Sequence, residues 1–244
     1  MMMLEHEAKE LLDSVGVSVP QGFIIRPGKA AAERASARIE LYPVAVKAQV
    51  RSGARGKQGG VAQAGDGPAL TAAIERLFAT EFGGERPEAL LIEPWLAIER
   101  ELYLSVTVDG RADGYLVMYA PRGGIDIEDG PPPARYPVGA AHRFRTHEMR
   151  DVLKDVESDY QVREKVVALA QRLVRTAALR DCTTIEINPL VKLADGEIVA
   201  ADAKVVRDEW AAFRNREIAD QREHAKQRVD RLLRDCLNMQ HMYV

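Results

Sequence analysis

The residues with the clearest chemical potential lie in the segment 184–205, whose alternation of apolar and polar residues predicts a β-hairpin. If the loop of this hairpin has three residues, Asn188 lies opposite Asp202 and Glu186 lies opposite Lys204. A carboxylate that faces an amide oxygen offers two hard oxygen ligands, which suits Mg²⁺ when water and nucleotide phosphates fill its other positions. An Asn–Asp hydrogen bond and a Glu–Lys ion pair on a solvent-facing sheet fit the same spacing.

The same register decides which side chains of the hairpin are buried. The three-residue loop is Ala194-Asp195-Gly196, a common hairpin form with glycine in the left-handed position. One nearly unbroken apolar face then contains the odd-numbered residues Ile185, Ile187, Pro189, Val191, Leu193, Val199, Ala201, Ala203 and Val205. A two-residue turn would shift the register by one and bury part of the polar set. We therefore expect the four polar groups to share one face, at the end of the hairpin away from its turn.

A second candidate is Lys47, which lies on the polar side of a predicted strand at 44–50. The glycine-rich stretch 52–60 follows this strand at once. Small residues let backbone amides approach phosphate oxygens closely, and a lysine supplies the compensating charge. The glycine spacing is neither that of a Walker A loop nor that of a dinucleotide fingerprint. Phosphate binding and a surface loop beside a solvated lysine both fit this pattern.

Composition and charge argue against several other classes of protein. The chain has 34 Lys and Arg against 37 Asp and Glu, so it has no excess of cations for nucleic acid or for a membrane surface. Cys182 and Cys236 are far apart, and the five histidines share no metal-binding spacing. We therefore expect no disulfide framework, no zinc site and a reducing, cytoplasmic location. No stretch approaches the ~18 apolar residues of a membrane span, and the N-terminus lacks the features of a signal peptide.

The order of predicted elements divides the chain into two α+β parts that join near 93–96. The elements expected in the first part are helix 4–15, strand 23–25, helix 29–39, strand 44–50, helix 69–80 and strand 89–92. The elements expected in the second part are an antiparallel meander over 101–119, an irregular proline-rich loop over 130–139, a helix over 162–180 and the hairpin. Residues 206–235 mix acidic and basic side chains along a helical pattern, which is typical of a solvated helix face.

Five sequence motifs occur in order along almost the whole chain. They are LEHEAKELL at 4–12, VAVKAQV at 44–50, GARGKQGGV at 53–61, ERELYL at 99–104 and IEINPLV at 185–191. Asp202-Ala203-Lys204 and Phe213-Arg214 follow them. Together these motifs resemble the ATP-grasp part of the succinyl-CoA synthetase β subunit.

This resemblance implies an α+β fold of the ATP-grasp type, in which two lobes clamp a nucleotide. The smaller lobe would comprise 22–95, and the larger lobe would comprise 1–21 and 96–244. The implied cofactors are ATP and Mg²⁺, and Pro20 occupies a position where proline favours ATP over GTP. The implied site residues are Lys47 and the backbone of Ala54, Arg55 and Gly56 at the phosphates, Glu93 and Leu96 at the adenine, Glu101 at the ribose, and Asn188 and Asp202 at Mg²⁺.

The resemblance also implies a partner. Glu186 would orient a phosphohistidine that enters from a separate α subunit, which also binds CoA. In that family ATP phosphorylates the histidine, the phosphoryl group passes to a carboxylic acid, and CoA attacks the acyl phosphate to form the thioester, a reaction of the tricarboxylic acid cycle. The protein would align the reactants and neutralise charge with lysine, backbone amides and metal.

Two features depart from that family. Its β subunit continues beyond the position of Val244 into a second α/β domain, so we expect this chain to require further protein for the full reaction. The segment 130–142 is short and rich in proline, which leaves the identity of the acid open. A nucleotide-sensing or regulatory subunit without turnover of its own is the alternative function. A stand-alone ATP-grasp carboxylate–amine ligase is a third.

Overall fold

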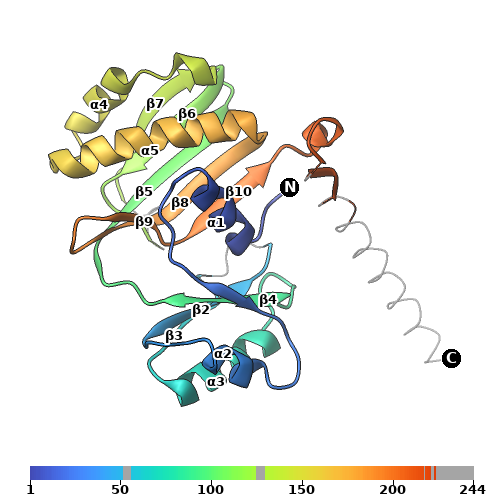
Figure 1. The fold of residues 1–244 in the computed structure, drawn as a ribbon. Helices are drawn as coiled ribbons and strands as arrows, with labels where there is room; N and C mark the ends of the chain where they lie inside the picture. Colours follow the sequence, from blue (N-terminus) through green and yellow to red (C-terminus); the bar gives the residue numbers. More distant parts are fainter. Residues whose placement is uncertain (52–55, 125–129, 217, 221–222, 224–244) are drawn as a thin grey trace.

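Two antiparallel β-sheets, each packed against its own helices, make up the part of the protein shown in colour in Figure 1. The structure is a computed structural model that describes residues 1–51, 56–124, 130–216, 218–220 and 223. Each sheet has a separate hydrophobic core, and these cores define a small lobe and a large lobe. The combination of helices with antiparallel sheets confirms the expected α+β class.

The small lobe is built on a four-stranded sheet in the order β1-β4-β2-β3. Its strands are β1 (Phe23–Ile25), β2 (Val44–Gln49), β3 (Val61–Ala64) and β4 (Ala89–Pro94). Its helices are α2 (Ala31–Ser36) and α3 (Gly67–Ala79). Helix α3 begins where the Asp66 carboxylate accepts a hydrogen bond from the Ala69 N–H at 2.8 Å, because a cap of this kind satisfies a free amide of the first turn. The apolar side of α3 then enters the core through Leu70, Ala73, Ile74 and Leu77.

The large lobe is built on a six-stranded sheet with the order β10-β8-β5-β6-β7, in which β9 also pairs with β8. Its strands are β5 (Ile98–Asp109), β6 (Gly114–Ala120), β7 (Ala134–Gly139), β8 (Cys182–Leu193), β9 (Ile198–Ala200) and β10 (Ala203–Arg207). Its helices are α1 (Glu5–Ser14), α4 (Thr146–Lys154) and α5 (Tyr160–Leu179), with short 3₁₀ helices η2 (Ala141–Arg143) and η3 (Glu209–Phe213). Apolar side chains of α1 and α5 enter the same core, so the N-terminal helix belongs to the large lobe.

The segment before α4 differs from the sequence prediction. We expected an irregular loop over 130–139, but Ala134–Gly139 forms β7, which pairs with β6 at the edge of the large sheet. Pro137 has no N–H to donate, and an edge strand tolerates proline because one of its sides makes no ladder hydrogen bonds. Helix α4 is also not evident from the sequence, since Met149 and Leu153 are its only fully buried residues.

The register of the C-terminal hairpin agrees with the sequence prediction. Lys204 pairs with Glu186 between β10 and β8. The Asn188 N–H donates to the carbonyl of Asp202 at 3.3 Å, so these two residues lie opposite each other. Gly196 closes the three-residue loop with a φ of 82°, a left-handed conformation that glycine adopts at low cost.

The predicted single apolar face of this hairpin is wrong beyond Pro189. Before Pro189, Ile185 and Ile187 of β8 face the large-lobe core, together with their partners Val205 and Ala203 on β10. After Pro189, Leu190 of β8 and its partner Ala200 on β9 face this core. The residues Val191, Val199 and Ala201 form a separate cluster, against which Leu96 and Leu193 pack. The pairing of β5 with β8 shifts by one residue between Leu102 and Leu104, and the extra residue in β8 reverses the alternation of its faces.

In the described part of the chain, every helix is too short or too polar to cross a membrane. Half of the residues of the predicted charged helix over 206–235 lie outside the described residues. The prediction is wrong at its start, because residues 206 and 207 end strand β10. The 3₁₀ helix η3 follows, and it begins where the Asp208 carboxylate accepts from the Trp210 N–H at 3.0 Å.

Candidate functional site

A cleft of about 770 Å³ lies between the small lobe and the large lobe. Eight of the residues that the sequence predicts for a site line it: Lys47, Gly56, Glu93, Leu96, Glu101, Glu186, Asn188 and Asp202. The predicted residues Ala54 and Arg55 lie outside the described residues. Every predicted site residue that the structure describes therefore borders the same cleft.

The pairing of the strands explains how these residues meet. Lys47 of β2 pairs with Leu91, and Ala45 pairs with Glu93 of β4, so Lys47 and Glu93 point to the same face of the small sheet. The chain then passes through the linker 95–97 into β5 of the large sheet. This short connection brings the central strands β2 and β4 of the small sheet close to the polar residues of the hairpin, which line the same cleft.

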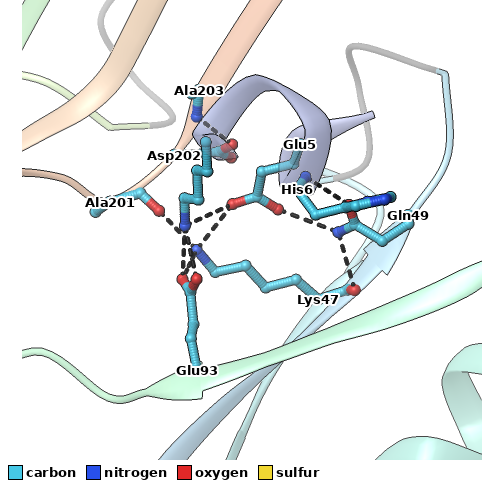
Figure 2. A network of polar contacts seen from close by, with 9 residues as sticks. Glu5, His6, Lys47, Gln49, Glu93, Ala201, Asp202 and Ala203 are labelled. Atoms are coloured by element: carbon cyan, nitrogen blue, oxygen red, sulfur yellow. Dashed lines mark hydrogen bonds and ion pairs between the residues drawn. The ribbon is translucent and has the colours of Figure 1, made fainter. Parts of the chain in front are cut away.

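Lys47 lies in a buried network of charges rather than in solvent (Figure 2). Its Nζ lies 3.1 Å from Glu5 Oε1 and 2.5 Å from Glu93 Oε1. It also donates to the carbonyl of Ala201 at 2.7 Å, which connects it to the large lobe. Burial alone would lower the pKa of the Lys47 ammonium, but Glu5, Glu93 and Asp202 outweigh it and hold the pKa above its ordinary value. The ammonium therefore carries its full charge at the cleft.

The network includes three residues that the sequence reasoning missed. Glu5 and Lys9 come from α1, and Gln49 comes from the last position of β2. Gln49 donates to Glu5 Oε2 at 3.2 Å and accepts from the His6 N–H at 3.0 Å. Glu5 and Lys9 lie within the motif at 4–12, but the sequence gives them no role, because their i,i+4 spacing is typical of many exposed helices.

The candidate metal ligands Asn188 and Asp202 already make hydrogen bonds that orient them. Asn188 Oδ1 accepts from the Gly124 N–H at 2.7 Å, and its amide donates to the Gly124 carbonyl at 3.2 Å. Asp202 Oδ1 accepts from the Ala203 N–H at 2.7 Å. An amide or carboxylate oxygen has two lone pairs, so a single hydrogen bond to it does not by itself exclude a cation.

These two side chains suit a Mg²⁺ ion whose remaining ligands are water and phosphate oxygens better than an ion that protein side chains enclose completely. Among the residues that the structure describes, no group of three His, Cys, Asp or Glu side chains could enclose an ion. Mg²⁺ is usually bound by one or two carboxylates, with water and substrate phosphates completing the octahedron. The hard oxygens of Asn188 and Asp202 at the cleft match that donor set.

Glu186 borders the cleft beside two buried hydroxyl groups. It pairs with Ser105 across β8 and β5, and Tyr103 donates to Ser105 Oγ at 3.0 Å. Burial raises the pKa of Tyr103, and the charge of Glu186 adds to this effect. The Tyr103 hydroxyl therefore stays protonated and can continue to donate.

The lining of the cleft also includes apolar side chains. Trp95, Leu96 and Ile98 from the linker and the start of β5 line it. The Glu101 carboxylate lies beside Gly124, whose φ of 89° is a left-handed conformation that other side chains rarely adopt. The lining of the cleft thus combines apolar side chains, a lysine, and amide and carboxylate oxygens, a combination that suits a metal–nucleotide complex.

Comparison with known proteins shows which family this chain belongs to. The model of the ATP-grasp domain matches residues 2–192. The succinate–CoA ligase [ADP-forming] subunit beta of Methanocaldococcus jannaschii is 33% identical over 220 residues, which are 88% of this chain and 59% of the relative. The subunit of the same name from a Hydrogenobaculum species is 36% identical over 234 residues, or 90% of this chain and 59% of the relative. The chain thus spans about three fifths of the length of these relatives.

Solved structures share the fold at lower identity. PH1788 from Pyrococcus horikoshii superposes with a TM-score of 0.70 at 20% identity, over 85% of this chain and 92% of that one. ATP citrate lyase from Methanothrix soehngenii gives a TM-score of 0.67 at 19% identity, over 87% of this chain and 52% of that one. The family match over most of the chain, together with the two lobes and their cleft, shows that this chain belongs to the ATP-grasp domain family.

Proposed function

We propose that this chain is the ATP- and Mg²⁺-binding part of an acid–CoA ligase of the succinyl-CoA synthetase type, acting in the cytoplasm. The observation that supports this most strongly is the convergence of Lys47, Glu186, Asn188 and Asp202 on one interlobe cleft. The relatives named succinate–CoA ligase subunit beta support the same class of reaction. We infer ATP rather than GTP as the nucleotide, and equal-Mg²⁺ competition between the two would test this.

In this proposal each part of the cleft has one task. Lys47 and the backbone at Gly56 bind the phosphates, while Leu96 and the backbone near Glu93 border the adenine. Asn188 and Asp202 hold Mg²⁺, which would neutralise charge on the phosphates when bound. The protein contributes alignment and electrostatic stabilisation, as is general for phosphoryl transfer.

The proposed acceptor of the phosphoryl group is a histidine of a partner α subunit. Glu186 would orient that histidine, and the Tyr103–Ser105 hydrogen bond lies on the neighbouring strand. The carboxylic acid and CoA would reach the site through the assembled complex. This division of labour requires no catalytic histidine in this chain.

Asp202→Asn tests the metal site. The substitution keeps the size of the side chain but removes a charge, and contacts to charged groups are worth about 1.5–3 kcal/mol, or roughly ten- to a hundredfold in affinity. We expect calorimetric titration with Mg-ATP to show this loss with unchanged thermal melting. Asp195→Asn, at the exposed turn of the same hairpin, is the matched control and should bind like wild type. Equal affinity of Asp202→Asn and wild type would favour a plain cross-strand pair.

A second experiment separates the alternative functions. The chain is mixed with a candidate α subunit, and ATP- and CoA-dependent thioester formation is measured with a panel of carboxylic acids. Tight ATP binding without thioester formation would favour a nucleotide-sensing or regulatory subunit. Ligation of an amine without CoA or a partner would favour a carboxylate–amine ligase.

A further inference from the structure

Four buried charged residues connect the two lobes behind the proposed phosphate site. Glu5 and Lys9 lie on α1, which packs into the core of the large lobe. Lys47 and Glu93 lie on β2 and β4 of the small sheet. All four side chains are less than a tenth exposed. Figure 2 shows that Glu5, Lys47 and Glu93 point toward one another between the helix and the strands.

Lys9 is the residue of this group that engages Glu93 most completely. Its Nζ lies 2.9 Å from one carboxylate oxygen of Glu93 and 2.7 Å from the other. The same Nζ lies 3.1 Å from Glu5 Oε1. Lys47 contacts both of these carboxylates as well. Two acids and two lysines thus balance each other, which is the condition under which buried charges are tolerated.

The balance matters because Lys47 has two competing tasks. In the proposed function its ammonium moves to the nucleotide phosphates, so its contacts with Glu5 and Glu93 must weaken. Without another cation, that movement would leave two uncompensated buried carboxylates near an incoming anion. Lys9 lies within contact distance of both carboxylates and belongs to neither the glycine-rich loop nor the hairpin.

We propose that Lys9 is a positioning residue that neutralises Glu5 and Glu93, so that Lys47 can exchange these carboxylates for the phosphates of a nucleoside triphosphate. This inference rests on the proposed function and adds a residue to it. Lys9 acts through Lys47 and does not contact the nucleotide. The effect of Lys9 on ATP affinity should therefore depend on the net charge of the four buried residues.

Three variants of the full chain test the sign of this effect by Mg-ATP calorimetry. Lys9→Met keeps much of the side-chain volume but leaves one excess negative charge, so ATP affinity should fall about tenfold. Glu5→Gln removes one competitor for Lys47, so ATP affinity should rise by about threefold or more. The double variant restores neutrality and should recover most of the affinity lost in Lys9→Met. Lys154→Met, at an exposed lysine of α4, is the control and should bind like wild type.

Thermal melts of each variant accompany the titrations. A purely structural role predicts that all three variants bind Mg-ATP more weakly than wild type or equally well, so opposite changes in affinity for Lys9→Met and Glu5→Gln support the proposal. Unchanged affinity of folded Lys9→Met, or no recovery in the double variant, would overturn it. If Lys9→Met does not fold, an equal or weaker affinity of Glu5→Gln overturns it instead. Failure of wild type to bind Mg-ATP would overturn the proposed function and this inference with it.

Discussion

Glu157 links the beginning of β5 to the start of α5. Replacing it tests how much this link, close to the end of the interlobe linker, contributes to the free energy of unfolding. Its carboxylate is buried and receives two hydrogen bonds from Arg100, at 3.2 and 2.9 Å. Tyr119 donates to the same carboxylate, and so does the Asp159 N–H at 2.9 Å. Four donors thus converge on one buried anion.

We expect Glu157→Gln to destabilise the protein by about 2–3 kcal/mol. Breaking a buried charge pair costs about 3–5 kcal/mol, and the value is reduced here because 31% of the Arg100 side chain remains accessible to water. The new amide also has only one acceptor oxygen, so at least one of the donors loses its partner. Tyr119→Phe removes a single donor and should cost about 1 kcal/mol. For a chain of this size, 2–3 kcal/mol corresponds to roughly 5–10 °C in melting temperature.

The effect should depend on pH in a defined direction. Burial alone would raise the pKa of Glu157, but hydrogen bonds from Arg100, Tyr119 and the Asp159 backbone hold the pKa below its ordinary value. A carboxylate with a lowered pKa contributes its stability fully above the unfolded pKa of about 4.3, and loses it as the pH falls through the folded pKa. The difference between wild type and Glu157→Gln should therefore be largest near neutral pH and should shrink in acid.

Urea denaturation of wild type and variants between neutral and acidic pH measures these differences. Asp151→Asn is the control, because Asp151 and Lys154 form an exposed ion pair and should contribute no measurable stability. A Glu157→Gln variant that loses less stability than Tyr119→Phe would refute the reasoning. A difference from wild type that stays constant as the pH falls would refute it too.

Two further predictions concern the hairpin and the linker. Ile187→Asn should destabilise the protein by about 3–5 kcal/mol, because Ile187 is fully buried and the new amide would have no hydrogen-bond partner. The control, Ala194→Asn at the exposed turn of the hairpin, should melt like wild type. Trp95 lines the cleft and is 43% exposed, so Mg-ATP should change its fluorescence, and the change should persist in Trp210→Phe. A change that vanishes with Trp210, or wild-type stability of Ile187→Asn, would contradict these expectations.

The sequence by itself determined the parts of this protein that depend on near neighbours in the chain. The alternation of side chains and the loop Ala194-Asp195-Gly196 were enough to place Asn188 opposite Asp202, because a hairpin register follows from the loop length. The same kind of local pattern identified the strand that carries Lys47.

Only the tertiary structure decided what depends on contacts between distant segments. The reversal of faces at Pro189 follows from pairing with β5, and β7 is a strand because β6 offers it an edge. The partners of Lys47 could not be predicted either, since Glu5 and Glu93 lie more than forty positions away on different elements. The periodicity of apolar residues predicts which side of a helix or strand is buried. It does not predict which charged side chains form ion pairs with one another, because those pairs form between elements that only the packing of the two lobes brings together.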